Sequence, residues 1–196
     1  MKKRLLFIAV LACTFTSQAQ VTFTPGIRAG ANISTISNTD GSSKTGFYIG
    51  AVGSLKLAKF YTLQPEISYS SQGAKDISLY NYDDSYNGYI EKKDINLDYV
   101  SITLMNKFNF QQLFLQVGPS IDVLVSSSKY IANDIDIATN IGLGIDLTKN
   151  FTIEARFKMG MIGLIDDYYN SYENSSYYIY NNNRGRTFQI GGIFKF

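Results

Sequence analysis

The chain is poor in the residue types that most enzymes use. It has no histidine in 196 residues, and its one cysteine is Cys13. Histidine is the commonest general base, the commonest metal ligand and a member of the usual serine-hydrolase triad. A carboxylate pair such as Asp166 and Asp167 is present, but adjacent acids at the start of a loop are more often simply solvated. We therefore expect a protein that is not an enzyme and needs no cofactor.

One acidic segment has the outline of a twelve-residue calcium loop. Asp83, Ser85 and Asn87 take its first, third and fifth positions, Gly88 the sharp turn, and Asp94 the twelfth position. The serine and the final aspartate depart from the usual ligands, and no helix pattern flanks the segment. The same composition is ordinary turn chemistry. A calcium site and a plain polar loop both remain open.

Tyrosine is concentrated in two long polar segments. The first contains Tyr80, Tyr82, Tyr86 and Tyr89, and the second contains Tyr168, Tyr169, Tyr172, Tyr177, Tyr178 and Tyr180. Binding loops use tyrosine among Asn and Ser because it offers contact area at low entropic cost. Tyrosines also form aromatic girdles and strand extensions at a membrane surface. The second segment is thus a candidate binding site for an extracellular ligand or an envelope protein, with a girdle as the alternative.

The elements that must position these residues are strands, because strict alternation dominates the chain. In the segment 151–161 apolar residues alternate with Glu154, Arg156 and Lys158. A slip of one residue would move these charges to the apolar face, so the register is strongly specified. Similar patterns predict strands near residues 27–34, 47–57, 61–70, 95–108, 113–125, 135–147 and 188–196. Within 95–108 the apolar phase changes, and a bulge near Tyr99 would reconcile the two halves.

The links between these segments alternate in length. They are short near residues 59–60, 109–112 and 148–150, and long and polar near 37–44, 74–93, 126–133 and 165–185. An even strand number with short periplasmic turns and long extracellular loops is typical of outer-membrane barrels. We predict an all-β fold over residues 20–196, an eight-stranded antiparallel up-and-down transmembrane β-barrel in the cell outer membrane. Both termini should lie on the periplasmic side.

A soluble calyx with its apolar face inward would alternate as well. The charges at mid-strand and the alternating link lengths favour lipid outside. The final aromatic strand ends on Phe196, which resembles the terminal signal read by the outer-membrane assembly machinery. Outer-membrane lipid and that machinery are therefore the expected partners. Nucleic acid is not expected, because the net charge is only +2 and no basic stripe is present.

The first 19 residues have the pattern of a cleaved signal peptide. Basic residues at 2–4 precede a short apolar run. The small residues Ser17 and Ala19 occupy positions −3 and −1 of a cleavage site after Ala19. The sequence just before Cys13 also resembles a lipoprotein box, so lipidation at Cys13 is the alternative to cleavage after Ala19.

The predicted inward positions carry a nearly balanced set of charges. They are Arg28, Lys56, Glu66, Lys107, Asp122, Asp136, Asp146, Glu154, Arg156, Lys158 and Lys195. The interior of an eight-stranded barrel is just wide enough for side chains to fill it. Isolated charges in so narrow a space are costly, so these groups should pair or hydrate. We expect a salt-bridged lumen charge network that plugs the barrel, with a narrow porin-like channel as the alternative.

Three sequence elements resemble the PorT-like outer-membrane β-barrel family of Bacteroidota. They are Gly26-Ile27-Arg28-Ala29-Gly30-Ala31-Asn32, Phe47-Tyr48-Ile49-Gly50-Ala51, and the run from Lys59 to Ser70 with Leu63-Gln64-Pro65-Glu66 at its centre. The fourth strand departs, since Ser101-Ile102-Thr103 stands where the family usually has Glu-Ile-Pro. The resemblance implies the fold and the outer-membrane location. For function it leaves a structural or surface-binding role, a channel, or an accessory subunit of a secretion or envelope complex.

Overall fold

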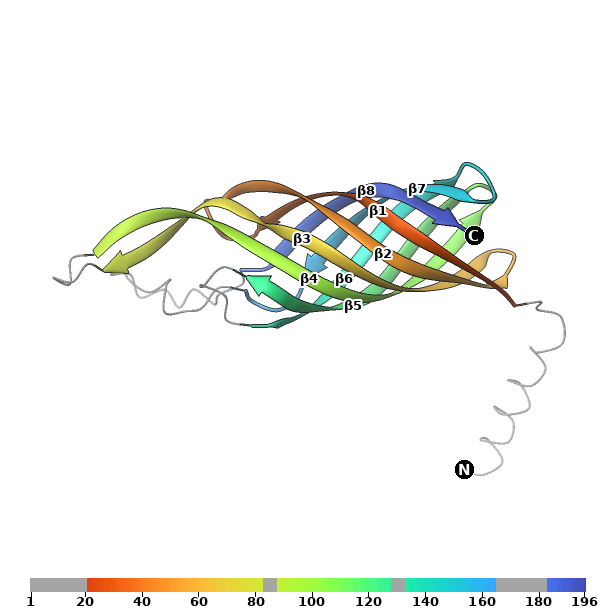
Figure 1. Cartoon of the computed structure of the whole chain (residues 1–196), viewed down its shortest axis with the longest axis horizontal. Helices are drawn as coiled ribbons and strands as arrows, with labels where there is room; N and C mark the ends of the chain where they lie inside the picture. The colour runs from red at the N-terminus through yellow and green to blue at the C-terminus, as the bar shows by residue number, and fades with distance from the viewer. Residues whose placement is uncertain (1–20, 83–87, 128–132, 165–182) are drawn as a thin grey trace, which may run out of the picture.

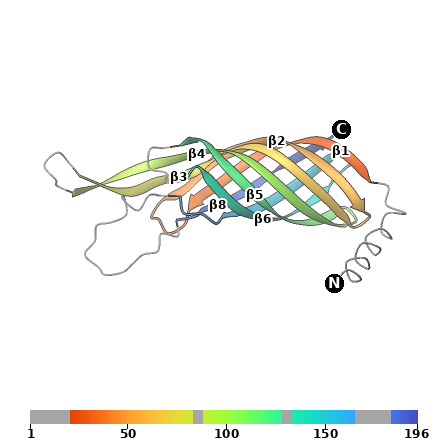
Figure 2. The ribbon, with the colours of Figure 1, turned by 90° about the horizontal axis from the view of Figure 1, so that it is seen from below.

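The computed structural model is a closed barrel of eight antiparallel strands (Figures 1 and 2). It describes residues 21–82, 88–127, 133–164 and 183–196. The strands are β1 (Thr22–Ile36), β2 (Ser42–Ala58), β3 (Tyr61–Tyr82), β4 (Gly88–Phe110), β5 (Leu113–Ser127), β6 (Ile135–Asp146), β7 (Phe151–Gly160) and β8 (Gly185–Lys195). Each strand pairs with its neighbour in sequence, and β1 closes the ring on β8. The predicted fold class is confirmed.

Alternation gives the wall two different faces. Large apolar side chains such as Ile27, Ile67 and Leu143 lie outward and are exposed, whereas their polar neighbours are buried in the lumen. Lipid covers such an apolar outer face in a membrane barrel, and ring closure satisfies the backbone hydrogen bonds of the wall. No helix among the residues described is long and apolar enough to span a membrane.

The predicted bulge near Tyr99 does not reverse the alternation of β4. Ile95, Leu97 and Tyr99 are buried inside the barrel, in the same phase as the inward Ser101 further along the strand. The irregularity at this level lies in the neighbouring strand, because Val125 of β5 is an extra residue between the partners of Asp98 and Tyr99. The lumen is apolar at this level, so β4 places apolar residues inside here and outside further along. Its alternation continues unbroken.

The predicted long link at residues 74–93 is mostly strand. The pairing of β3 with β4 continues to Tyr82 and Gly88, with one irregularity between Ala74 and Ile77. β2 pairs with β3 only as far as Lys75, so the paired segments 77–82 and 88–93 form a two-stranded ribbon that projects beyond the barrel (Figure 1). The ribbon lies at the end opposite the short turns. We call these two ends the long-loop end and the short-turn end.

Candidate functional site

Five charged side chains meet near the middle of the lumen. Alternation turns Arg28 of β1, Glu66 of β3, Lys107 of β4, and Glu154 and Arg156 of β7 inward, and each is at least 95% buried. We call them the central ionic cluster. Since they come from four strands, they join opposite parts of the wall.

Arg156 is the best-bonded member of the cluster. It donates to both carboxylate oxygens of Glu66, Nη1 to Oε2 and Nη2 to Oε1, each at 2.7 Å. Its Nη2 also donates to Glu154 Oε2 at 2.8 Å. A bidentate guanidinium–carboxylate pair is among the strongest and most directional of ionic contacts. Glu66 and Arg156 are therefore fixed in orientation as well as in position.

The two other cations complete the cluster. Arg28 lies 3.2 Å from Glu66 Oε2 and 3.1 Å from Glu154 Oε1, and Lys107 Nζ lies 4.0 Å from Glu154 Oε2. Aromatic rings cover both cations, Tyr48 at 4.3 Å from the Arg28 guanidinium carbon and Phe114 at 4.4 Å from Lys107 Nζ, each to the ring centroid. Three cations thus share two carboxylates, and Glu154 contacts all three.

Tyr48 fits this level because glycines face it. Gly30 lies opposite Tyr48 on β1, and Gly191 lies opposite Gly30 on β8. A Cβ at Gly30 would lie 2.6 Å from the Tyr48 hydroxyl oxygen, and a Cβ at Gly191 would lie 2.3 Å from it. The tyrosine therefore occupies the space left by two absent side chains.

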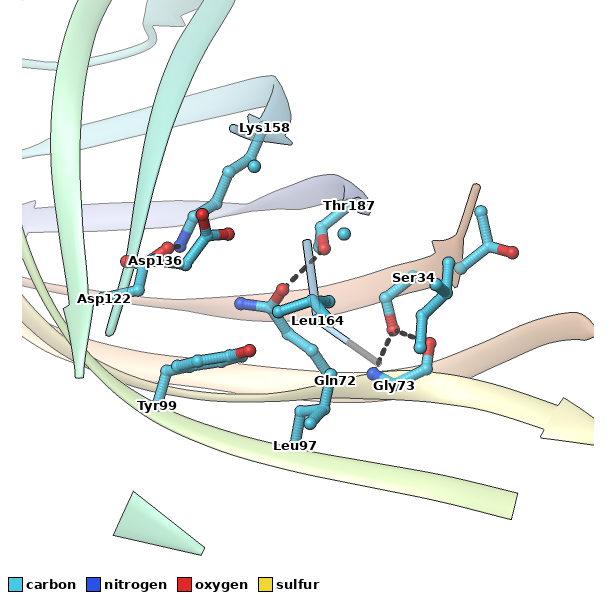
Figure 3. Close-up of a pocket in the computed structure, with 14 residues that line it drawn as sticks. Ser34, Gln72, Gly73, Leu97, Tyr99, Asp122, Asp136, Lys158, Leu164 and Thr187 are labelled. Carbon is cyan, nitrogen blue, oxygen red and sulfur yellow. Dashed lines mark hydrogen bonds and ion pairs between the residues drawn. The ribbon is translucent and has the colours of Figure 1, made fainter. Parts of the chain in front are cut away.

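A second charged level lies nearer the long-loop end. Lys158 Nζ is 2.6 Å from Asp122 Oδ2, and Asp122 faces Asp136 across the β5–β6 pairing. Asp136 Oδ1 accepts hydrogen bonds from the backbone amides of Met161 and Ile162 at 3.2 and 3.0 Å. Figure 3 shows the side chains of Lys158, Asp122 and Asp136 on one side of a small cavity and Tyr99 on another. The cavity has room for about one water molecule.

Apolar side chains fill the lumen at the long-loop end. This mouth cluster consists of Ile36, Ala74, Ile77, Ile95, Leu97, Tyr99 and Leu164, all of them buried. Backbone hydrogen bonds hold its rim, from Leu164 N to Asn183 O and from Ser37 N to Arg184 O, both at 2.9 Å. The side chains of the inner face therefore change from charged to apolar along the barrel axis.

The remaining predicted lumen charges lie at the short-turn end. Lys195 Nζ is 2.8 Å from Asp146 Oδ1, and Thr152 also donates to this oxygen. Both Lys195 and Asp146 are half-buried, and Lys56, although in the inward phase, is exposed. The structure thus brings together five of the predicted charges in the centre, three at the second level and two in this pair, and leaves Lys56 apart.

The calcium and loop candidates lie largely outside the residues described. That holds for Asp83, Ser85 and Asn87, for Asp166 and Asp167, and for Tyr168, Tyr169, Tyr172, Tyr177, Tyr178 and Tyr180. Asp94 lies in β4, where its Oδ1 accepts a hydrogen bond from the Asp76 amide at 3.1 Å. Residues 88–94 of the candidate calcium loop are part of β4 and have extended backbone. In the described ranges no three His, Cys, Asp or Glu residues gather as metal ligands would.

Sequence reasoning missed Tyr48, its glycine partners and the mouth cluster. The signal for Tyr48 was an aromatic residue in the polar phase, level with Gly30 in the strand pairing. The signal for the mouth cluster was the phase change near Tyr99.

A closed ring with an apolar outside and charges within defines an outer-membrane β-barrel. The sequence comparison agrees, because the model of the family described as "Outer membrane protein beta-barrel domain" matches residues 17–166. The chain belongs to this family. Its strands are transmembrane, and the protein is located in the outer membrane. The PorT-like branch is a finer assignment than this match.

Two solved structures have a similar fold. Neisserial surface protein A is 16% identical with a TM-score of 0.52, covering 89% of this chain and 97% of that one. OprG from Pseudomonas aeruginosa is 12% identical with a TM-score of 0.50, covering 91% and 98%. At such identities the likeness concerns the fold alone. No curated protein sequence matches the chain.

Proposed function

We propose that the protein is a non-conducting outer-membrane barrel that acts as a structural or surface-binding scaffold. The observation that carries this proposal is the central ionic cluster. Its members reach into the lumen from β1, β3, β4 and β7 and are bonded to one another, with Arg156 only 2% exposed. A permeating ion would have to separate charge pairs held at 2.7–3.2 Å.

Two further features support a plugged lumen over a narrow channel. The mouth cluster adds an apolar layer, which a hydrated ion enters only at high cost. The cavity between the second charged level and the mouth cluster has room for only about one water molecule. A cavity of this size fits the hydrated plug that the near balance of inward charges predicts.

Single-channel recording in planar bilayers tests the closed lumen. The purified wild type should give no unitary current steps, and a known porin reconstituted in parallel serves as the positive control. A variant that opens both layers should conduct if it folds, and it replaces with Ala the residues Arg28, Glu66, Glu154, Arg156, Ile95 and Leu97. Reproducible steps from the folded wild type would refute the plug and favour the channel.

Surface binding is supported by the ribbon at the long-loop end. β3 and β4 are 22 and 23 residues long, whereas β7 has 10, so the two strands extend past the wall. Crossing the membrane takes only about 9–11 residues of a tilted strand. The extra length serves no membrane crossing, and it presents backbone and side chains to the exterior.

The tyrosine-rich segment at residues 165–182 is the proposed contact for an extracellular ligand or an envelope protein. Replacing Tyr177, Tyr178 and Tyr180 with Ser should abolish binding while the barrel still assembles. Cross-linking on intact cells would compare the partners of the wild type with those of the triple variant. Heat-dependent migration in electrophoresis would check that both are folded. Unchanged partners would contradict this contact.

Three finer assignments are part of the same proposal. Residues 1–19 are removed as a signal peptide, Phe196 serves the assembly machinery, and the chain is a PorT-like barrel, for which an accessory role in an envelope or secretion complex is the alternative function. The mature N-terminus should be Gln20 by mass spectrometry, and a lipidated Cys13 at the terminus would contradict that cleavage. Affinity purification from membranes tests the complex, and recovery of the barrel alone would count against it.

A further inference from the structure

The two ends of the barrel carry very different charges. At the long-loop end acids and bases are interspersed, as with Asp76 beside Lys75 and Glu91 beside Lys92. Among the residues that the structure describes, the exposed charged side chains at the short-turn end are Lys56, Lys59 and Lys149. The one carboxylate side chain described there, Asp146, is ion-paired with Lys195. The short-turn end therefore has uncompensated positive charge.

Phenylalanines accompany the lysines of this end, with the exception of Lys56. Phe60 follows Lys59 in the β2–β3 turn, Phe151 begins β7 two residues after Lys149, and Phe196 follows the ion-paired Lys195. Phe60 and Phe196 are 65% and 68% exposed. Exposed aromatic rings at the edge of the apolar band mark the headgroup level of a membrane barrel.

We propose that Lys59 and Lys149, together with Phe60, Phe151 and Phe196, form a lysine–phenylalanine rim that binds anionic glycerophospholipid headgroups of the periplasmic leaflet. Short periplasmic turns are the rule for such barrels, which places the rim at that leaflet. The rings lie among the upper acyl chains, and the neighbouring ammonium groups extend to the phosphates while their stems stay in apolar surroundings. The β2–β3 and β6–β7 turns are too short to carry Lys59 and Lys149 far beyond the headgroups. A lipid therefore fits the rim better than a distant periplasmic partner.

Lipid selectivity measured by electron spin resonance tests the rim. The folded barrel is reconstituted in phosphatidylcholine vesicles with trace spin-labelled phosphatidylglycerol or phosphatidylcholine. At low ionic strength the wild type should prefer phosphatidylglycerol by about fivefold, the effect of one lysine near an anionic group. At about 1 M salt the preference should largely vanish, because screening then acts within about 3 Å. Equal association of the two lipids at low salt would overturn the proposal.

Two charge-matched variants separate the rim from general electrostatics. The rim variant Lys59→Gln/Lys149→Gln should lose the preference. The control Lys75→Gln/Lys92→Gln removes the same charge from exposed positions at the long-loop end and should keep it. An unchanged preference in the rim variant, or an equal loss in the control, would overturn the proposal.

A second pair of variants covers failure of the rim variant to fold. Lys149→Gln alone should weaken the preference. Gln112→Lys adds a lysine to the β4–β5 turn, where Phe110 is exposed without a neighbouring lysine, and should strengthen it. Heat-dependent migration confirms folding of each protein. If both variants matched the folded wild type, the lysines would be simply solvated and the proposal would be wrong.

Discussion

The middle and the long-loop end of one lumen are filled in opposite ways. In the middle, the central ionic cluster joins four strands through ion pairs. At the end, the mouth cluster joins β1, β3 and β4 to Leu164 by apolar packing. Ion pairs need partners in particular places, whereas apolar packing needs mainly volume. Loss of one member should therefore be tolerated less well in the centre than at the mouth.

The largest effect is expected for Glu154→Gln. This carboxylate contacts Arg28, Lys107 and Arg156, so its neutralisation leaves three buried cations with one counter-charge. Breaking a buried ionic group in this way costs about 3–5 kcal/mol. Urea unfolding of the barrel in lipid vesicles measures the loss. Asp146→Asn, which neutralises the half-buried pair with Lys195, should cost at most about 1 kcal/mol. Similar losses of stability in both variants would remove the distinction between the centre of the lumen and its short-turn end.

Ile95→Ala tests the mouth cluster and should have a smaller effect. Ile95 is fully buried, and its truncation leaves a cavity that the neighbouring side chains fill only in part. A loss of about 2–3 kcal/mol is expected, at the low end for such truncations. Ile90→Ala, on the ribbon at 69% exposure, is the control and should change the free energy of unfolding by less than about 0.5 kcal/mol. If Ile95→Ala lowered the free energy of unfolding more than Glu154→Gln, the mouth would tolerate the loss of a member less well than the centre.

Gly191→Ala probes how tightly the wall fits the central level. The new Cβ would lie 2.2 Å from the Ala29 carbonyl oxygen and 2.3 Å from the Tyr48 hydroxyl oxygen. Overpacking of this kind costs about 1–3 kcal/mol, which urea unfolding would again measure. Tyr48→Phe in the same background should recover part of the loss, because it removes one of the three atoms that lie within 3.0 Å of the new Cβ. An unchanged free energy of unfolding in Gly191→Ala would indicate that the wall can accommodate the added methyl group at little cost.

The smallest effect concerns pH at the foot of the ribbon. The hydroxyl and the amide of Ser78 donate to Asp40 and hold the pKa of that carboxyl below its ordinary 3.8. A lowered pKa adds stability above the unfolded pKa, and the contribution is lost as pH falls through the folded value. Pepsin should therefore cleave the ribbon more slowly in wild type than in Asp40→Asn at about pH 5, and the difference should shrink as pH falls below the ordinary pKa of 3.8. A rate difference that stayed constant over this range would contradict the titration of Asp40.

Much of the wall could be predicted from the sequence, because alternation is a local property. The charged residues of β7 identified the inward face of that strand, and the structure places Glu154, Arg156 and Lys158 inside. Which charge meets which could not be predicted. Arg28 and Glu154 are 126 residues apart, and their contact depends on ring closure and on the register of every intervening strand.

The mouth cluster was unpredictable for a different reason. Isoleucine and leucine serve on both faces of this barrel, facing outward at Ile102 and inward at Ile95. Residue type alone therefore does not identify the buried face. The change of apolar phase was a true signal, but a bulge and an apolar lumen produce the same pattern. The polar Ser101 and Thr103, continuing the phase of Ile95, were the observation that favoured the lumen.

The central ionic cluster also has a consequence for the order of folding. Arg28 lies on the first strand and its partner Glu154 on the seventh, and Gln189 on the last strand lies 3.3 Å from Arg28. An open sheet separates these groups, so its charges stay hydrated and resist burial in lipid. We therefore expect neutralisation of the lumen and the joining of β1 to β8 to occur together, late in assembly. The charges that close the lumen thus also disfavour an incompletely closed barrel in the membrane.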